Sequence, residues 1–159
     1  MEEVEIINAL AYLLQYMAEY EKAQGLYRKA LGISERVLGE EHPDTAASYN
    51  NLAGVYESQG EYGKAEELYE KALGIRKRVL GEEHPDTATS YNNLAGVYKR
   101  QGRYEIAINY WCKAYNVFVC RLGIGHPHTK VALENMRSVY SEWNPDGDFK
   151  QWLKENMEG

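Results

Sequence analysis

The sequence has little of several features that would place it in common protein classes. It contains two cysteines and four prolines among 159 residues, and no apolar run reaches the ~20 residues that a membrane-spanning helix needs. No signal peptide is visible at its start. These absences argue against a membrane protein and favour a protein of the reducing cytoplasm.

Excess positive charge is also missing. The formal net charge is −6 and the pI is near 5.3. A protein that binds nucleic acid needs a basic surface to offset the phosphate charge. We therefore expect no nucleic-acid partner.

Recognisable catalytic and metal-binding motifs are absent as well. The GxSxG, phosphate-loop and dinucleotide-binding patterns do not occur, and Cys112 has no histidine at a telling spacing. His42 and His84 fall in successive copies of a repeat, and packed helix axes lie ~10 Å apart, so these side chains are too distant to share one ion. We expect them to serve helix starts, and we predict no enzyme activity, no metal and no cofactor.

The two cysteines fall eight residues apart on one expected helix, Cys112 and Cys120. Eight residues span ~12 Å along a helix axis, which is too far for an intrachain disulfide. We predict that both are buried free thiols.

A repeat of 42 residues dominates the sequence. The letters HPDTA begin at His42 and again at His84, with a weaker copy at His126, and SYNNLAGVY begins at Ser48 and again at Ser90. A period of this size is typical of one supersecondary unit that cannot bury its apolar face alone.

Each unit reads as a helix hairpin. Pro43 suits the first turn of a helix, where its missing N–H has no partner in any case. Apolar residues then recur at helical spacing until Gly60, which favours a helix end. A second apolar helix is expected from about Glu61 to Gly81.

The pattern of small and large residues resembles the tetratricopeptide repeat family. Its first helix carries a large residue, Leu, a small residue and Tyr, and its second carries Tyr, Ala, an aromatic residue and Ala. The matching positions are Tyr49, Leu52, Ala53, Tyr56, Tyr62, Ala65, Tyr69 and Ala72. The 42-residue form is most similar to the repeats of kinesin light chains. The resemblance implies an all-α, right-handed superhelix, a solenoid of about four helix hairpins.

The repeat boundaries follow from the motif positions. We expect one tetratricopeptide domain over 1–159, with repeats at about 1–41, 42–83, 84–125 and 126–159. A short final helix over 148–157 carries Phe149, Trp152 and Leu153 on one stripe and is interpreted as a cap. The first helix is unusually apolar, where a terminal solenoid helix should be polar outside. Three interpretations explain this apolar helix: a homodimer formed through it, a longer parent chain, or a terminus that is merely apolar.

Two rows of asparagines need an explanation, because Asn is a poor residue for a helix interior. Asn8, Asn50 and Asn92 form one row, and Asn51, Asn93 and Asn135 form the other. In tetratricopeptide proteins the first helices line a concave groove, and an Asn amide both donates and accepts hydrogen bonds with a peptide backbone. The alternative is that one row merely hydrogen-bonds the neighbouring repeat and stiffens the stack.

The resemblance therefore implies a non-enzymatic scaffold that binds an extended peptide or partner protein in this groove. The predicted peptide-contacting residues are Asn8, Tyr12, Asn50, Asn51, Gly54, Asn92, Asn93, Gly96, Lys99, Arg100 and Asn135. The family's Lys and Arg clamp for a C-terminal carboxylate is not matched here, so an internal segment is favoured. A self-association module, or the sensor or adaptor part of a larger signalling protein, are the alternatives.

Overall fold

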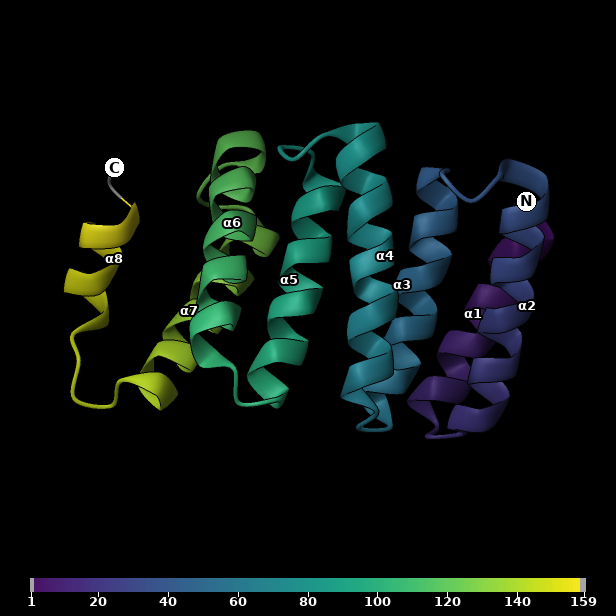
Figure 1. Cartoon of the computed structure of the whole chain (residues 1–159), viewed down its shortest axis with the longest axis horizontal. Coiled ribbons are helices and arrows are strands. Elements are labelled where there is room, and N and C mark those ends of the chain that lie inside the picture. Colours follow the sequence, from purple (N-terminus) through teal and green to yellow (C-terminus); the bar gives the residue numbers. More distant parts are fainter. Residues whose placement is uncertain (1, 158–159) are drawn as a thin grey trace. The chain divides into compact units, whose positions relative to one another are not determined.

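The structure, a computed structural model, describes residues 2–157 and is all-α over that range (Figure 1). Successive helices run as antiparallel pairs joined by short turns. The helices are α1 (Glu2–Tyr16), α2 (Tyr20–Leu38), α3 (Pro43–Ser58), α4 (Tyr62–Leu80), α5 (Pro85–Arg100), α6 (Tyr104–Leu122), α7 (Pro127–Trp143) and α8 (Phe149–Met157). None of these helices combines the length and the apolar character needed to cross a membrane.

The chain divides into two compact units, residues 1–81 and 82–159. The first unit contains the pairs α1–α2 and α3–α4, and the second contains α5–α6 and α7–α8. In each unit the second helix of one pair packs against the first helix of the next, α2 on α3 and α6 on α7.

The first helices of the later pairs begin with a histidine cap. His42, His84 and His126 precede the helix-starting prolines, and each imidazole Nδ1 accepts a hydrogen bond from the backbone N–H two residues on, at 3.1–3.2 Å. The bond satisfies one of the unpartnered N–H groups of the first turn. The predicted role of these histidines at helix starts is thus confirmed.

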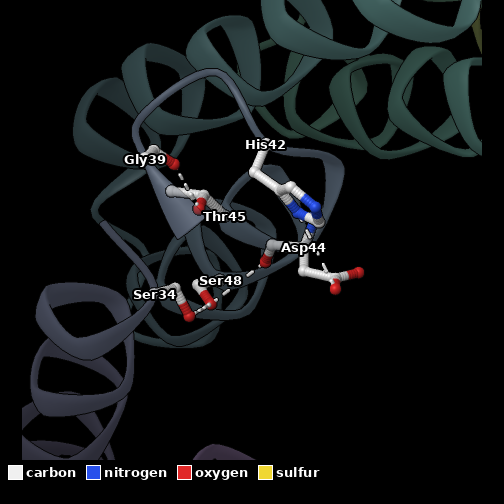
Figure 2. A network of polar contacts seen from close by, with 6 residues as sticks. All are labelled: Ser34, Gly39, His42, Asp44, Thr45 and Ser48. Carbon is white, nitrogen blue, oxygen red and sulfur yellow. Dashed lines mark hydrogen bonds and ion pairs between the residues drawn. The ribbon is translucent and has the colours of Figure 1, made fainter. Parts of the chain in front are cut away.

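A second polar network holds the junction between α2 and α3 (Figure 2). Thr45 Oγ1 donates to the carbonyl oxygen of Gly39 at 2.7 Å, and the hydroxyls of Ser34 and Ser48 lie 3.2 Å apart across the two helices. Thr129 donates to Gly123 in the same way in the second unit. These buried hydroxyls fix where each new first helix starts against the helix before it.

Glycines with positive φ end the helices at the predicted places. Gly60 has φ +75° after α3, and Gly81 has φ +90° after α4. A residue with a Cβ is strained in this conformation, which explains glycine there.

The core consists of small residues facing large ones, as the family pattern requires. In the first unit Ala46, Tyr49, Ala72 and Ile75 form a buried cluster against which Leu31 and Leu68 pack. Not every apolar position of the repeat is buried, however. Val79, which the helical spacing assigns to the apolar set of the second helix, is exposed.

The last helix packs through aromatic rings. Tyr140 of α7 lies 5.5 Å from the Phe149 ring and 5.4 Å from the Trp152 ring, measured between centroids. Asp148 Oδ1 caps the helix by accepting from the N–H groups of Lys150 and Gln151. These contacts cover one side of Tyr140 with α8.

Candidate functional site

The first helices leave one narrow stripe uncovered. On α3 this stripe contains Asn50, Asn51, Gly54 and Ser58, while Leu52, Ala53, Val55 and Tyr56 between them are buried. On α5 the same register positions are Asn92, Asn93, Gly96 and Arg100. The predicted peptide-contacting residues of both helices therefore share one accessible face of their own helix.

The first asparagine of each pair is tied to the second helix of its own hairpin. Asn92 Oδ1 accepts a hydrogen bond of 3.0 Å from the indole Nε1–H of Trp111 on α6. With its amide turned so that Oδ1 faces α4, Asn50 accepts from Nη1 and Nη2 of Arg76 at 2.7 and 3.1 Å. These bonds join the two helices of one hairpin, so they tie each asparagine to its own repeat and not to the neighbouring one.

Arg76 itself corrects an expectation from sequence. It belongs to the run Arg76-Lys77-Arg78, which predicts a solvated helix face, yet only 8% of Arg76 is exposed. Its position seven residues after Tyr69 places it on the buried stripe of α4. That spacing is the signal in the sequence that identifies it as a partner for a first-helix residue.

The second asparagine of each pair has a different environment. Asn51 and Asn93 are half-buried on the accessible stripe, and neither side chain forms a hydrogen bond or ion pair with the described residues. Each amide therefore keeps its donors and its acceptor for a ligand or for water.

In the first unit, Gln15 links α1 to α3 along the accessible face. Its Nε2 donates to the carbonyl oxygen of Gly54 at 3.1 Å and to Ser58 Oγ at 3.0 Å. Tyr12 is exposed beside it, and the Oδ1 atom of Asn8 is enclosed without a hydrogen-bond partner among the described residues. A Cβ added at Gly54 would meet Tyr69 Oη at 3.6 Å and Gln15 Nε2 at 3.8 Å, which are ordinary contacts.

In the second unit, Lys99 links α5 to α7. Its ammonium nitrogen lies 2.8 Å from Ser138 Oγ and 2.8 Å from Glu142 Oε1. Asn135 Nδ2 also reaches Asn92 Oδ1, at 3.5 Å. Lys99 and Asn135 thus join neighbouring first helices, whereas Arg100 is exposed and makes no hydrogen bond or ion pair within the described chain.

The outer face of α1 is apolar and open. Ile6, Leu10, Leu13 and Met17 follow one helical stripe, and Ile6 and Leu13 are 63% and 56% exposed. The equivalent residues of α3, Ser48, Leu52 and Val55, are buried. Burial of that stripe on α3 accompanies its packing on α2, so α1 differs in having no helix over the stripe within the described residues.

Two titratable side chains, Tyr69 and Cys112, have pKa values raised by burial. Burial raises the pKa of the Tyr69 hydroxyl, and the nearby Glu57 carboxylate, 3.1 Å away, raises it further. Burial also raises the pKa of the Cys112 thiol to about 11. No three side chains of the His, Cys, Asp or Glu type cluster as metal ligands there.

The prediction that both cysteines are buried is wrong for Cys120, which is exposed, and Cys112 is only half-buried. Trp111, Ala114 and Phe118 form the buried side of α6. Cys120 lies nine residues after Trp111, which places it on the opposite side of the helix.

Comparison with known proteins identifies the family. The sequence profile of the tetratricopeptide repeat matches residues 2–78 and 51–118. The chain belongs to the tetratricopeptide repeat family, and its fold is that of the family's all-α solenoids. A comparison with curated proteins finds no match.

Solved structures similar to the chain come from kinesin-light-chain-like proteins. BtubC (BKLC) from P. vanneervenii is 34% identical, with a TM-score of 0.79 over 89% of this chain and 56% of that one. A putative kinesin light chain of Podosopora anserina with nearly identical TPR-like repeats is 26% identical, with a TM-score of 0.80 over 89% of this chain and 68% of that one. The chain therefore spans little more than half the length of BtubC. The apo form of RapI, at 23% identity and a TM-score of 0.78, shares the fold.

Proposed function

We propose that the chain is a non-enzymatic, cytoplasmic scaffold whose accessible first-helix stripes bind an extended segment of a partner protein. Membership of the tetratricopeptide repeat family supports a protein-interaction role in general. The observation that carries the finer proposal is the contrast between adjacent asparagines. Asn50 and Asn92 are engaged by the second helices, whereas Asn51 and Asn93 keep their hydrogen-bonding groups available on an accessible stripe.

Each residue of the predicted site then takes a definite role. The amides of Asn51 and Asn93 bind the peptide backbone, and Gly54 and Gly96 allow that backbone to approach the helix. Tyr12 and Arg100 contact side chains of the bound segment. Asn50, Asn92, Asn135 and Lys99 act indirectly, by holding the helices that carry the stripe, and Asn8 lies at the start of the same row.

The test begins with a peptide selected against the full chain from a random twelve-residue library. Its affinity is then measured by fluorescence anisotropy for the parent and for the double variant Asn51→Ala, Asn93→Ala. Each lost hydrogen bond is worth ~0.5–1.5 kcal/mol net. The pair should therefore weaken binding by about tenfold or more, with no loss of thermal stability, because Ala is the better helix former.

The matched control is the double variant Asn109→Ala, Asn116→Ala, which removes two exposed asparagines of α6 away from the stripes. It should bind the selected peptide like the parent. Equal affinity of parent and Asn51/Asn93 variant for every selected peptide would refute the proposed site.

A second candidate function is self-association through α1, favoured by the exposed stripe that begins at Ile6. A second copy packed on that stripe would remove four large apolar side chains from water, each worth about 1.5–3 kcal/mol when fully buried. The variant Leu10→Gln, Leu13→Gln should then convert a dimer to a monomer in light scattering. Val37→Gln on α2, also at an exposed apolar residue, should leave the mass unchanged. A monomeric parent at micromolar concentration would exclude this candidate.

A further inference from the structure

The last helix, α8, is held more lightly than the other second helices. The helices α2, α4 and α6 each have 19 residues and bury several of them, whereas α8 has 9 residues and none of these is buried. Isolated helices shorter than ~12–15 residues are marginal in water. The helical form of α8 therefore depends on its contacts with α7 and on its cap at Asp148.

The sequence of α7 explains this light attachment. On α3 two alanines, Ala46 and Ala53, are fully buried, and their small side chains let a neighbouring helix approach closely. Two repeat periods later α7 has Lys130 and Arg137 at these positions, and both are exposed. Long side chains in place of methyl groups keep a neighbouring helix at a distance. A second helix therefore cannot pack along the whole of α7 as α4 packs along α3.

The contacts between α7 and α8 centre on one residue, Tyr140. Its ring meets the Phe149 and Trp152 rings, which stack on each other with their centroids 6.0 Å apart. The Arg137 guanidinium lies 5.8 Å from the centroid of the Phe149 ring. Phe149 and Trp152 stay half-buried, but only 4% of Tyr140 is exposed beneath them. A small set of aromatic contacts thus decides whether Tyr140 meets water.

The turn between the two helices, residues 144–147, closes tightly against the same tyrosine. Asn144 Nδ2 donates to Tyr140 Oη at 3.0 Å, and the backbone N–H of Gly147 donates to the carbonyl oxygen of Asn144, also at 3.0 Å. A Cβ on Gly147 would clash with Asn144 Nδ2 and Tyr140 Oη. The φ of Gly147 lies outside the left-handed region, so space and not backbone conformation requires glycine here. Closure of α8 onto α7 therefore depends on the absence of a side chain at position 147.

We propose that α8 is a hinged flap, which opens and closes about residues 144–147 while α7 stays folded. In the closed form its aromatic side chains cover Tyr140. In the open form α8 loses its contacts with α7, and Tyr140 becomes accessible at the C-terminal end of α7. A weakly held segment of this kind opens with a lower free energy than the whole chain needs to unfold. None of these residues belongs to the accessible stripes of α3 and α5, so the flap is independent of the peptide-binding proposal.

Native-state hydrogen exchange of the full chain, followed by NMR, tests the flap. The backbone amides of residues 152–157 should exchange at least about a hundredfold faster than the buried amides in the middle of α7, because they need only the local opening. The opening of so short a helix exposes little surface, and the effect of urea scales with the surface exposed. Low concentrations of urea should therefore accelerate the exchange of α7 while they barely change that of α8.

The decisive variant is Gly147→Ala, which adds a Cβ that clashes in the closed form. It should accelerate exchange in α8 by about three- to tenfold, the factor expected when a side chain must leave its preferred rotamer, and should leave exchange in α7 unchanged. Hydroxyl-radical footprinting read by mass spectrometry should show a matching rise in the oxidation of Tyr140. The matched control is Gly125→Ala, in the turn before α7, where an added Cβ meets no atom of the described chain within 4 Å. It should change neither quantity.

Three results would overturn the proposal. Equal exchange rates in α7 and α8, with the same dependence on urea, would show that the two helices unfold together. A Gly147→Ala variant that accelerates exchange in α7 as much as in α8, or that matches the parent in both measurements, would show that residue 147 is not the hinge. Slower exchange of α8 at higher protein concentration would show that a second copy holds this helix, and a flap within one chain would then be wrong.

Discussion

Adjacent asparagines on α5 should have opposite effects on stability when truncated. Asn92→Ala removes the acceptor of the Trp111 indole N–H, and Trp111 is buried. An unpaired buried donor costs ~1–3 kcal/mol, while the better helix propensity of Ala returns ~0.5 kcal/mol. We expect a net loss of about 1–2 kcal/mol, which corresponds to a fall of roughly 2–8 °C in Tm for a chain of this size. Asn93→Ala, one residue further on, removes no hydrogen bond within the described chain and should be neutral or slightly stabilising.

A double-mutant cycle isolates the bond itself. Urea unfolding followed by far-ultraviolet circular dichroism gives the free energy of unfolding for Asn92→Ala in the parent and in a Trp111→Phe background. Phe has no N–H to leave unpaired, so the cost of Asn92→Ala should shrink by about 1 kcal/mol or more in that background. If Asn92→Ala and Asn93→Ala had equal stability, or if the cycle showed no coupling, the distinction between the two asparagine rows would be wrong.

Three further predictions address other parts of the chain. Gly54→Ala should raise the free energy of unfolding by roughly 0.5–1 kcal/mol, because the added Cβ makes only ordinary contacts. It should also weaken the binding of the selected peptide if the ligand backbone passes there, and an unchanged affinity by fluorescence anisotropy would argue against that path. Burial raises the pKa of the Cys112 thiol to about 11 and so disfavours its reactive thiolate at pH 8. Mass spectrometry should show that iodoacetamide modifies Cys120 first and that labelling of Cys112 accelerates toward pH 11. Faster labelling of Cys112 than of Cys120 at pH 8 would contradict this. Removal of residues 148–159 takes away the Phe149 and Trp152 rings that cover Tyr140, so it should lower Tm or promote aggregation. A truncated chain as stable and soluble as the parent would show that α8 does not act as a cap.

Much of the fold could be predicted because the sequence repeats itself. The period fixes the hairpins, Pro43 and His42 mark a helix start, and Gly60 and Gly81 mark helix ends. These features act locally, within one or two turns of a helix, so a single sequence displays them directly. The structure divides into two compact units. The repeat boundaries and the assignment of one domain to the whole chain therefore remain predictions.

The site was less predictable because it depends on which side chains are long enough, and suitably oriented, to contact a neighbouring helix. Nothing in the letters NN shows that Asn92 accepts a hydrogen bond from Trp111, while the side chain of Asn93 forms none with the residues that the structure describes. The run Arg76-Lys77-Arg78 predicts a solvated face, and only the helical angle between Tyr69 and Arg76 shows that Arg76 lies on the buried side of α4. The same holds for Cys120, because the nine residues after Trp111 turn it away from the buried side of α6. Side-chain length and helix rotation decide such contacts, and both follow from the sequence once the helix bounds are known.

The threonine-to-glycine bond at the start of the first helices has a consequence for how such a chain can change its length. Thr45 bonds Gly39, and Thr129 bonds Gly123, each across an interval of six residues that the repeat reproduces. Excision of the segment from His42 to Glu83 would join Glu41 to His84 and set Thr87 six residues after Gly39 in the edited order. The new junction would carry the same glycine, histidine and threonine as the old one. Duplication or loss of a whole period in the gene would therefore preserve every junction, so that such a protein can gain or lose binding surface in whole units without an intermediate that cannot fold.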